Sequence, residues 1–133
     1  MIDQFSSLFS AHSLNPSRLV KLLINSHQFL SHTALPVFDI KPQDVKINVN
    51  GLAKFECVAS GNPQPSVYWT KEGMKDLMLP DNTYDRHHVT LEGVLEIKDV
   101  RKDDAGYYVC SAFSIAGSAT TRAFLEVSID KIN

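Results

Sequence analysis

Residues 104–110 read Asp-Ala-Gly-Tyr-Tyr-Val-Cys, and this stretch decides the fold because its distance along the chain to two other residues is constrained. Cys57 lies 53 positions before Cys110, and Trp69, the one tryptophan of the chain, lies between them. A cysteine, a tryptophan, and a second cysteine preceded by a tyrosine are typical, at this spacing, of a sandwich of two β-sheets. The sequence therefore predicts an all-β domain in which both cysteines face the core.

The two cysteines allow two interpretations. In the first, Cys57 and Cys110 form a disulfide bridge and the Trp69 indole packs on it. In the second they are buried thiols, because free cysteine is itself among the most buried residue types. A bridge would close a loop of about 54 residues and would add roughly 4 kcal/mol to the free energy of unfolding in the chain-entropy model.

Residues 104–110 also predict two polar contacts. The Tyr108 hydroxyl is expected to donate a hydrogen bond to the backbone a few residues upstream, as a tyrosine corner does. The Asp104 carboxylate is placed to accept a charge-assisted hydrogen bond, and Arg86 is the best candidate donor. The alternative for the second contact is two solvated charges.

Alternation of apolar and polar residues predicts short strands on both sides of this frame. Val89 and Leu91 indicate one of these strands. The inward-facing residues that the alternation predicts in the others are Ala53, Phe55, Ala59, Val67, Leu95, Ile97, Ala119, Thr121, Ala123, Leu125 and Val127. The corner at residues 61–65 contains two prolines, which fix φ and forbid a helix there. We therefore place the domain at residues 34–130.

Residues 1–33 differ from the rest of the chain. Asn15 and Pro16 are typical of a helix start, and apolar residues follow as far as Leu30. Lys21 and other polar residues interrupt this run, which makes it too broken to cross a bilayer and unlike a secretory signal. We expect a weakly helical or disordered segment that is not homologous to the domain and is dispensable to its fold.

Residues 36–128 resemble an immunoglobulin domain of the I-set, and more narrowly the fourth immunoglobulin domain of Roundabout axon-guidance receptors. The stretches that carry the narrower resemblance are Gly61-Asn62-Pro63-Gln64-Pro65, Trp69 with Lys71-Glu72-Gly73, Arg86, residues 104–110, and Ala116-Gly117-Ser118 ahead of Leu125-Glu126-Val127. The resemblance implies a cell-surface receptor with tandem immunoglobulin domains, fibronectin repeats, one membrane span and a signalling tail.

The function that this resemblance implies is that of a non-enzymatic extracellular module, either a spacer or a protein–protein contact. Its partners would be neighbouring immunoglobulin domains or a second receptor molecule, and it would meet the membrane through a parent chain of which this sequence is expected to be a fragment. The alternative is an intracellular structural module of a muscle or cytoskeletal protein, with the same fold and reduced cysteines. The redox compartment would separate the two.

Composition argues against several other classes of function. With 44% hydrophobic and 21% charged residues, the chain has the composition of an ordinary globular protein. Its net charge of −2 provides no positive electrostatic field that would attract nucleic acid. His87 and His88 are adjacent, but successive residues of a strand point to opposite faces and do not readily share a metal. The sequence contains no metal-ligand spacing, phosphate loop or nucleophile elbow. We expect no catalytic residue, cofactor or metal.

Strand alternation also predicts a face for a partner. If Trp69 and Cys110 face inward, their neighbours must face outward from the same sheet. The residues of this predicted partner face are Tyr68, Tyr107, Val109 and Phe124. Aromatic residues on neighbouring strands can merge into a patch that marks an interaction site. The alternative is that the rings only stabilise their own sheet as cross-strand pairs.

Overall fold

The computed structural model describes residues 32–129, which form ten strands and one 3-10 helix. The strands are β1 (Ala34–Ile40), β2 (Val45–Asn48), β3 (Ala53–Phe55), β4 (Val58–Asn62), β5 (Ser66–Lys71), β6 (Asn82–Tyr84), β7 (His87–Val89), β8 (Leu95–Ile97), β9 (Gly106–Ser114) and β10 (Gly117–Ser128), with the 3-10 helix η1 (Lys102–Asp104) before β9. The predicted all-β fold is confirmed. The helix expected after Asn15 lies outside the described residues.

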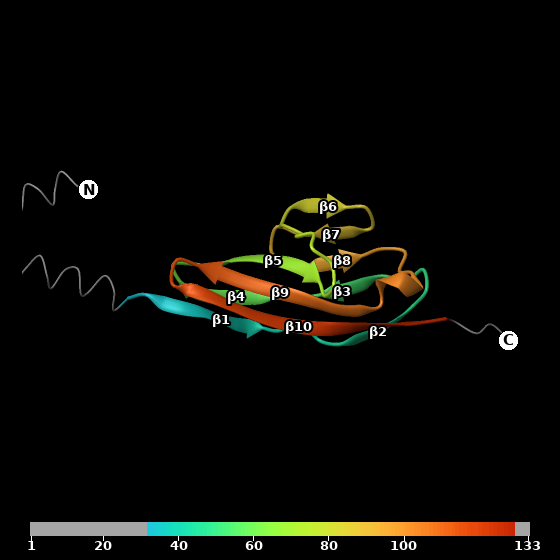
Figure 1. Ribbon diagram of the computed structural model, residues 1–133, viewed down its shortest axis with the longest axis horizontal. Helices are drawn as coiled ribbons and strands as arrows, with labels where there is room; N and C mark the ends of the chain where they lie inside the picture. The colour runs from blue at the N-terminus through green and yellow to red at the C-terminus, as the bar shows by residue number, and fades with distance from the viewer. Residues whose placement is uncertain (1–31, 130–133) are drawn as a thin grey trace, which may run out of the picture. The chain divides into compact units, whose positions relative to one another are not determined.

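The strands form two four-stranded sheets and one two-stranded sheet (Figure 1). The order β2-β10-β9-β5 makes the sheet that we call the long-strand sheet, and β3-β8-β7-β6 makes the short-strand sheet. Strand β1 pairs with β4 to form the third sheet. Strand β2 runs parallel to β10, whereas the other paired strands are antiparallel.

The register of the long-strand sheet brings the residues of the predicted frame together. Trp69 of β5 is directly opposite Cys110 of β9, and Tyr107 of β9 is opposite Phe124 of β10. Because side chains alternate along a strand, the first pair faces the core and the second pair faces away from it. The pairing of β9 with β5 and with β10 therefore determines which of these residues face the core and which face outward.

The core lies between the two four-stranded sheets and is apolar. Its largest fully buried side chains are Trp69, Tyr108, Phe55, Leu95, Ile97, Leu125, Val89, Val100, Cys57 and Cys110. The strand predicted from Val89 and Leu91 is shorter than expected, since β7 ends at Val89 and Leu91 is 72% exposed. Leu91 lies in a turn closed by hydrogen bonds from the Gly93 and Val94 backbone N–H groups to Thr90, so strand alternation has already ended there.

Candidate functional site

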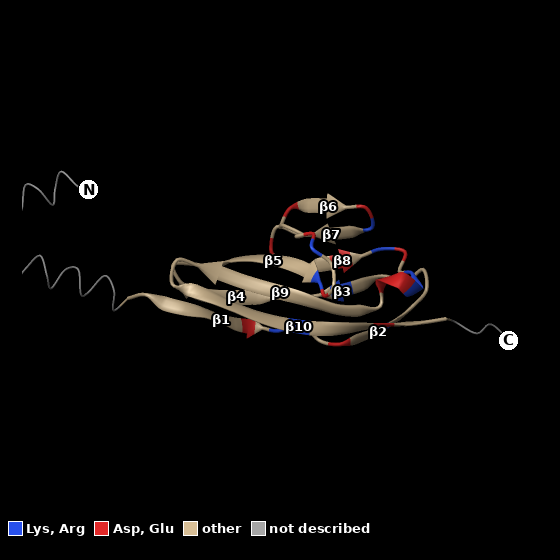
Figure 2. Cartoon of the chain, in the orientation of Figure 1, with Lys and Arg blue, Asp and Glu red and all other residues tan. Residues whose placement is uncertain are grey.

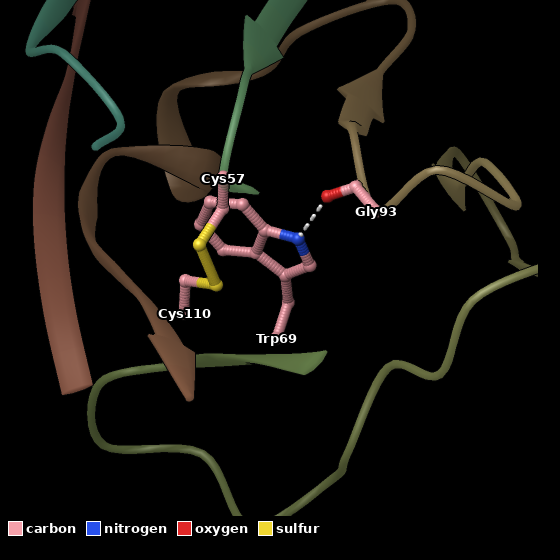
Figure 3. Close-up of a disulfide and its surroundings, with 4 residues drawn as sticks. All are labelled: Cys57, Trp69, Gly93 and Cys110. Atoms are coloured by element: carbon pink, nitrogen blue, oxygen red, sulfur yellow. Dashed lines mark hydrogen bonds between the residues drawn. A yellow bond between two sulfur atoms is a disulfide. The ribbon is translucent and has the colours of Figure 1, made fainter. Parts of the chain in front are cut away.

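The two cysteines of the frame form the predicted disulfide bridge. Cys57 and Cys110 are bonded, with their Cα atoms 6.6 Å apart, and both are almost completely buried. The Trp69 indole lies against the bridge, and its Nε1 donates a hydrogen bond of 2.8 Å to the Gly93 carbonyl oxygen (Figure 3). The bridge joins the chain just after β3 to β9, and so links the short-strand sheet to the long-strand sheet.

Tyr108 forms the polar contact expected of a tyrosine corner. Its hydroxyl donates a 2.7 Å hydrogen bond to the Asp104 carbonyl oxygen, and its ring lies 5.5 Å from the Phe55 ring centroid in the core. Burial raises the pKa of the Tyr108 hydroxyl, and the negative charge of Asp104 raises it further. Gly106 has φ of +141° at the start of β9, a conformation that favours glycine.

Arg86 and Asp104 form a two-pronged ion pair at one end of the core. The Arg86 guanidinium donates hydrogen bonds of 2.6 and 2.8 Å to the two Asp104 carboxylate oxygens. It also donates to the carbonyl oxygens of Lys98 and Asp99, at 3.2 and 3.0 Å. The Arg101 backbone N–H donates a further hydrogen bond of 2.7 Å to Asp104. The pair thus joins β7, the end of β8 and η1.

The charges of this pair hold each other in the ionised state. Burial alone would raise the pKa of the Asp104 carboxyl, but hydrogen bonds from the Arg86 guanidinium and the Arg101 backbone outweigh it and hold the pKa below its usual value. The hydrogen bond to Asp104 raises the pKa of Arg86. The side chains are 14% and 6% exposed, so solvent screens this attraction only weakly.

The outer face of the long-strand sheet carries an aromatic pair that joins β9 to β10. The ring centroids of Tyr107 and Phe124 lie 4.9 Å apart in an edge arrangement. The Arg122 guanidinium lies 3.9 Å from the Tyr107 centroid, and its Nη1 lies 3.0 Å from a Glu72 carboxylate oxygen. The rings therefore contribute to their own sheet as a cross-strand pair, and they also form a mixed apolar and charged surface.

A second aromatic pair on the same face joins β5 to β9. The ring centroids of Tyr68 and Phe113 lie 5.7 Å apart. Phe113 is 46% exposed and Tyr107 is 36% exposed, whereas Tyr68, Val109 and Phe124 are half-buried. All four residues of the predicted partner face thus lie on one sheet surface, but three of them are less exposed than alternation alone implies because neighbouring side chains cover them.

Two members of this surface were not among the predicted residues. Phe113 continues the period of two that runs from Tyr107 through Val109, and Arg122 lies two positions before Phe124. The same alternation therefore contained a signal for both. We name the whole set the aromatic face, and its residues are Tyr68, Tyr107, Val109, Phe113, Arg122 and Phe124.

His87, the first residue of β7, lies near the Arg86–Asp104 ion pair. It is half-buried, and its ring centroid lies 6.2 Å from that of Tyr108. Burial lowers the pKa of the His87 imidazole. The negative charge of Asp104 raises that pKa in part, whereas the positive charges of Arg86 and Lys71 lower it again. The folded protein therefore favours neutral His87.

This preference predicts a pH dependence of stability. An unfolded chain binds a proton at His87 below about pH 6.5, but the folded state does so only at lower pH, so acidification through this range favours unfolding. His87→Gln should lose less stability than the wild type between pH 7.5 and pH 5.5. His88→Gln is the matched control, because His88 faces the other way and contacts the Thr83 hydroxyl at 2.8 Å. Urea unfolding at the two pH values measures the difference, and an equal loss in His87→Gln and wild type would contradict it.

Metal-ligand groups are absent from the remaining surface of residues 32–129. No group of three or more His, Cys, Asp or Glu side chains in this range is arranged to hold a metal ion. Charges of both signs are interspersed around β6, β7, β8 and η1, and β9 carries none (Figure 2). Across the same described range, no helix has the length and hydropathy needed to cross a membrane.

The two facing sheets, the bridge between them, the tryptophan against it and the tyrosine corner define an immunoglobulin-type β-sandwich. Within that class the chain belongs to the immunoglobulin I-set domain family, whose family model matches residues 36–127.

Known proteins with similar sequences include the Roundabout homologs and Protein sax-3. The chain is 38% identical over 96 residues to Roundabout homolog 1 of Mus musculus, which covers 70% of this chain and 6% of that protein. It is 40% identical over 97 residues to Protein sax-3 of Caenorhabditis elegans, and this match covers 71% of this chain and 8% of that protein. The chain therefore matches only a small part, 6–8%, of the length of these curated relatives.

Similarity to solved structures supports the same fold independently of the sequence comparisons. Titin domain M7 superposes with a TM-score of 0.63 at 26% identity, and the match covers 72% of this chain and 96% of that domain. The chain is thus similar in sequence to Roundabout homologs and in fold to a domain of titin.

Proposed function

We propose that residues 34–130 form a non-enzymatic extracellular immunoglobulin module of a Roundabout-like guidance or adhesion receptor, equivalent to its fourth immunoglobulin domain. The similarity to Roundabout homologs supports the receptor assignment. The disulfide supports an oxidising compartment, since such bridges persist mainly in secreted and cell-surface proteins. Residues 1–33 would be a separate segment that the sandwich does not require.

The observation that carries the functional proposal is the aromatic face. Two aromatic pairs lie on the same outer face of β5, β9 and β10, with their β9 members six positions apart, and Phe113 and Tyr107 leave 46% and 36% of their surface open. Aromatic residues and arginine are enriched in protein–protein interfaces, whereas isolated exposed hydrophobes are ordinary. A contact role therefore explains the face better than a role as a spacer alone.

The partner that best fits this face is a second copy of the chain. Arg122 and Glu72 place one positive and one negative charge beside the rings, and both side chains are about half exposed. Two copies related by a two-fold axis bring the same patch against itself, so a surface with both charges is complementary to its own copy. The module would then support receptor-to-receptor contact.

The alternative function is that of an intracellular structural module. The structural similarity to titin domain M7 favours this alternative, because the match covers 96% of that domain. The two functions differ in the expected state of Cys57 and Cys110, which are oxidised at the cell surface and reduced in the cytosol.

A double substitution in the aromatic face tests the contact role. Tyr68→Ser with Phe124→Ser should weaken self-association of the full chain by about tenfold or more, because central aromatic residues carry much of the energy of an interface. The melting temperature should fall by less than about 16 °C, since the variant breaks two cross-strand pairs that contribute about 0.2 to 1 kcal/mol each, and about 1 kcal/mol shifts the melting temperature of such a domain by about 4 to 8 °C. Sedimentation velocity over a concentration series measures the association.

The control for this test removes exposed apolar side chains elsewhere. Leu91 and Ile115 are 72% and 86% exposed and lie outside the aromatic face, so Leu91→Ser with Ile115→Ser should leave self-association unchanged. A loss of stability in Tyr68→Ser/Phe124→Ser with association intact would contradict the interface and leave sheet packing as the role of the rings.

A further inference from the structure

A cavity of about 550 Å³ opens beside β5 and shares no residue with the aromatic face. Its walls come from the connection between β5 and β6, from β6 and β7, and from η1. The apolar part of the lining is Met74, Leu77, Met78 and Tyr84. Met74 and Leu77 are 59% and 50% exposed, so their apolar surface is open to a ligand.

The apolar lining of this cavity combines the exposed Met74 and Leu77 with Met78, which is only 7% exposed and belongs to the core. Two of the four apolar lining residues are methionines, whose unbranched side chains and polarisable sulfur adjust to ligands of different shape. Tyr84 is fixed, because its hydroxyl accepts a 3.0 Å hydrogen bond from the Leu79 backbone N–H. The cavity thus offers a flexible apolar wall next to a rigid aromatic one, which suits an aliphatic side chain.

The charged part of the lining has unused acceptors. The Asp104 carboxylate already accepts hydrogen bonds from Arg86, and the Lys71 ammonium donates a 2.5 Å hydrogen bond to the Asp103 carbonyl oxygen. The carboxylates of Asp76 and Asp103 are exposed and form no ion pair with any residue between 32 and 129. Two carboxylates from separate segments of the chain therefore border the cavity without a cationic partner.

We propose that this cavity binds an arginine side chain of a partner polypeptide. The aliphatic stem would lie on Met74 and Leu77, and the guanidinium would meet the carboxylates of Asp76 and Asp103. Arginine combines an apolar stem with a planar, permanently charged group that pairs with carboxylates, so it matches both halves of the lining. A purely aliphatic side chain would leave the carboxylates unused, and an anion would meet them as like charges.

Lys71 opposes this binding but does not prevent it. Its ammonium also lies 5.9 Å from the Tyr108 ring centroid, so it is held between that ring and the Asp103 backbone. With neutral His87 and the closed Arg86–Asp104 pair, the two free carboxylates outnumber the one lysine in the lining. The balance at the cavity is therefore negative, which selects a cation.

The test uses a blocked alanine pentapeptide with a central arginine as probe, and the same peptide with neutral citrulline as its isostere. Titration into the full chain should give saturable shifts of the Leu77 and Asp103 amide signals, with a dissociation constant on the order of 1 mM. The citrulline peptide and the variant Asp76→Asn/Asp103→Asn should each bind about tenfold more weakly. The Tyr107 amide, on the aromatic face, should not shift, which keeps this result independent of the proposed receptor contact.

The matched control removes two carboxylates that do not border the cavity. Glu92→Gln/Glu126→Gln changes the net charge by the same amount and should bind the arginine peptide as the wild type does. If Asp76→Asn/Asp103→Asn does not fold, Asp76→Asn alone provides the comparison. Equal affinity for the two peptides, wild-type affinity in the aspartate variant, or no shift at about 20 mM peptide would each overturn the proposal.

Discussion

Cys110→Ala should lower the free energy of unfolding by about 2 to 5 kcal/mol, the range found when a native disulfide is removed from a small domain. The bridge joins residues 53 positions apart, so without it the unfolded chain gains the conformations that the closed loop excludes. It also links the two sheets against which Trp69 packs. Since small domains are stable by only about 5 to 15 kcal/mol, this loss is a large part of the total.

Urea unfolding followed by Trp69 fluorescence measures this change. The double variant Cys57→Ala/Cys110→Ala and the chemically reduced wild type serve as controls, because together they separate loss of the bridge from loss of sulfur packing. Thiol titration of the unfolded wild type, purified from an oxidising host, should find no reactive cysteine. Two thiols under those conditions would contradict the bridge and favour the intracellular alternative.

Asp104→Asn should destabilise the fold by about 3 kcal/mol, because it leaves the Arg86 guanidinium buried without its counter-charge. We expect the lower end of the range for buried pairs, since Arg86 keeps 14% of its side chain exposed. The exposed pair Arg122–Glu72 provides the matched control, with both side chains about half exposed. Glu72→Gln should change stability by less than about 1 kcal/mol.

The pH dependence of this effect has a definite sign. The folded-state pKa of Asp104 lies below its unfolded value, so the pair stabilises the protein above about pH 4 and this stabilisation is lost as the pH falls through the folded pKa. The difference in unfolding free energy between wild type and Asp104→Asn should therefore shrink in acid. A difference that stays constant down to pH 2 would show that Asp104 acts by shape and not by charge.

The sequence predicted the core because the core depends on few, strongly constrained residues. Cys57, Trp69, Tyr108 and Cys110 have fixed spacing, and strand alternation then assigns their neighbours to one face or the other. The contact between Arg86 and Asp104 was also predictable, since a buried carboxylate near a strand start requires a donor.

What the sequence did not predict depends on turns and on contacts between distant segments. The strand predicted from Val89 and Leu91 was too long, because alternation was extended into the turn that Thr90 closes. The pairing of Phe113 with Tyr68 depends on the register of β5 against β9, which no local pattern specifies. The cavity beside β5 was missed for the same reason, since its walls come from separate parts of the chain.

The central claim, that the aromatic face is a contact between two copies of this module, is tested most directly by locating the contact. Amide signals of the full chain, recorded from dilute to concentrated protein, should shift or broaden at Tyr68, Tyr107, Phe113 and Phe124 and remain unchanged on β6, β7 and β8. Loss of these changes in Tyr68→Ser/Phe124→Ser would complete the result that we predict. Concentration-dependent changes confined to the short-strand sheet, or none at any concentration, would contradict the account.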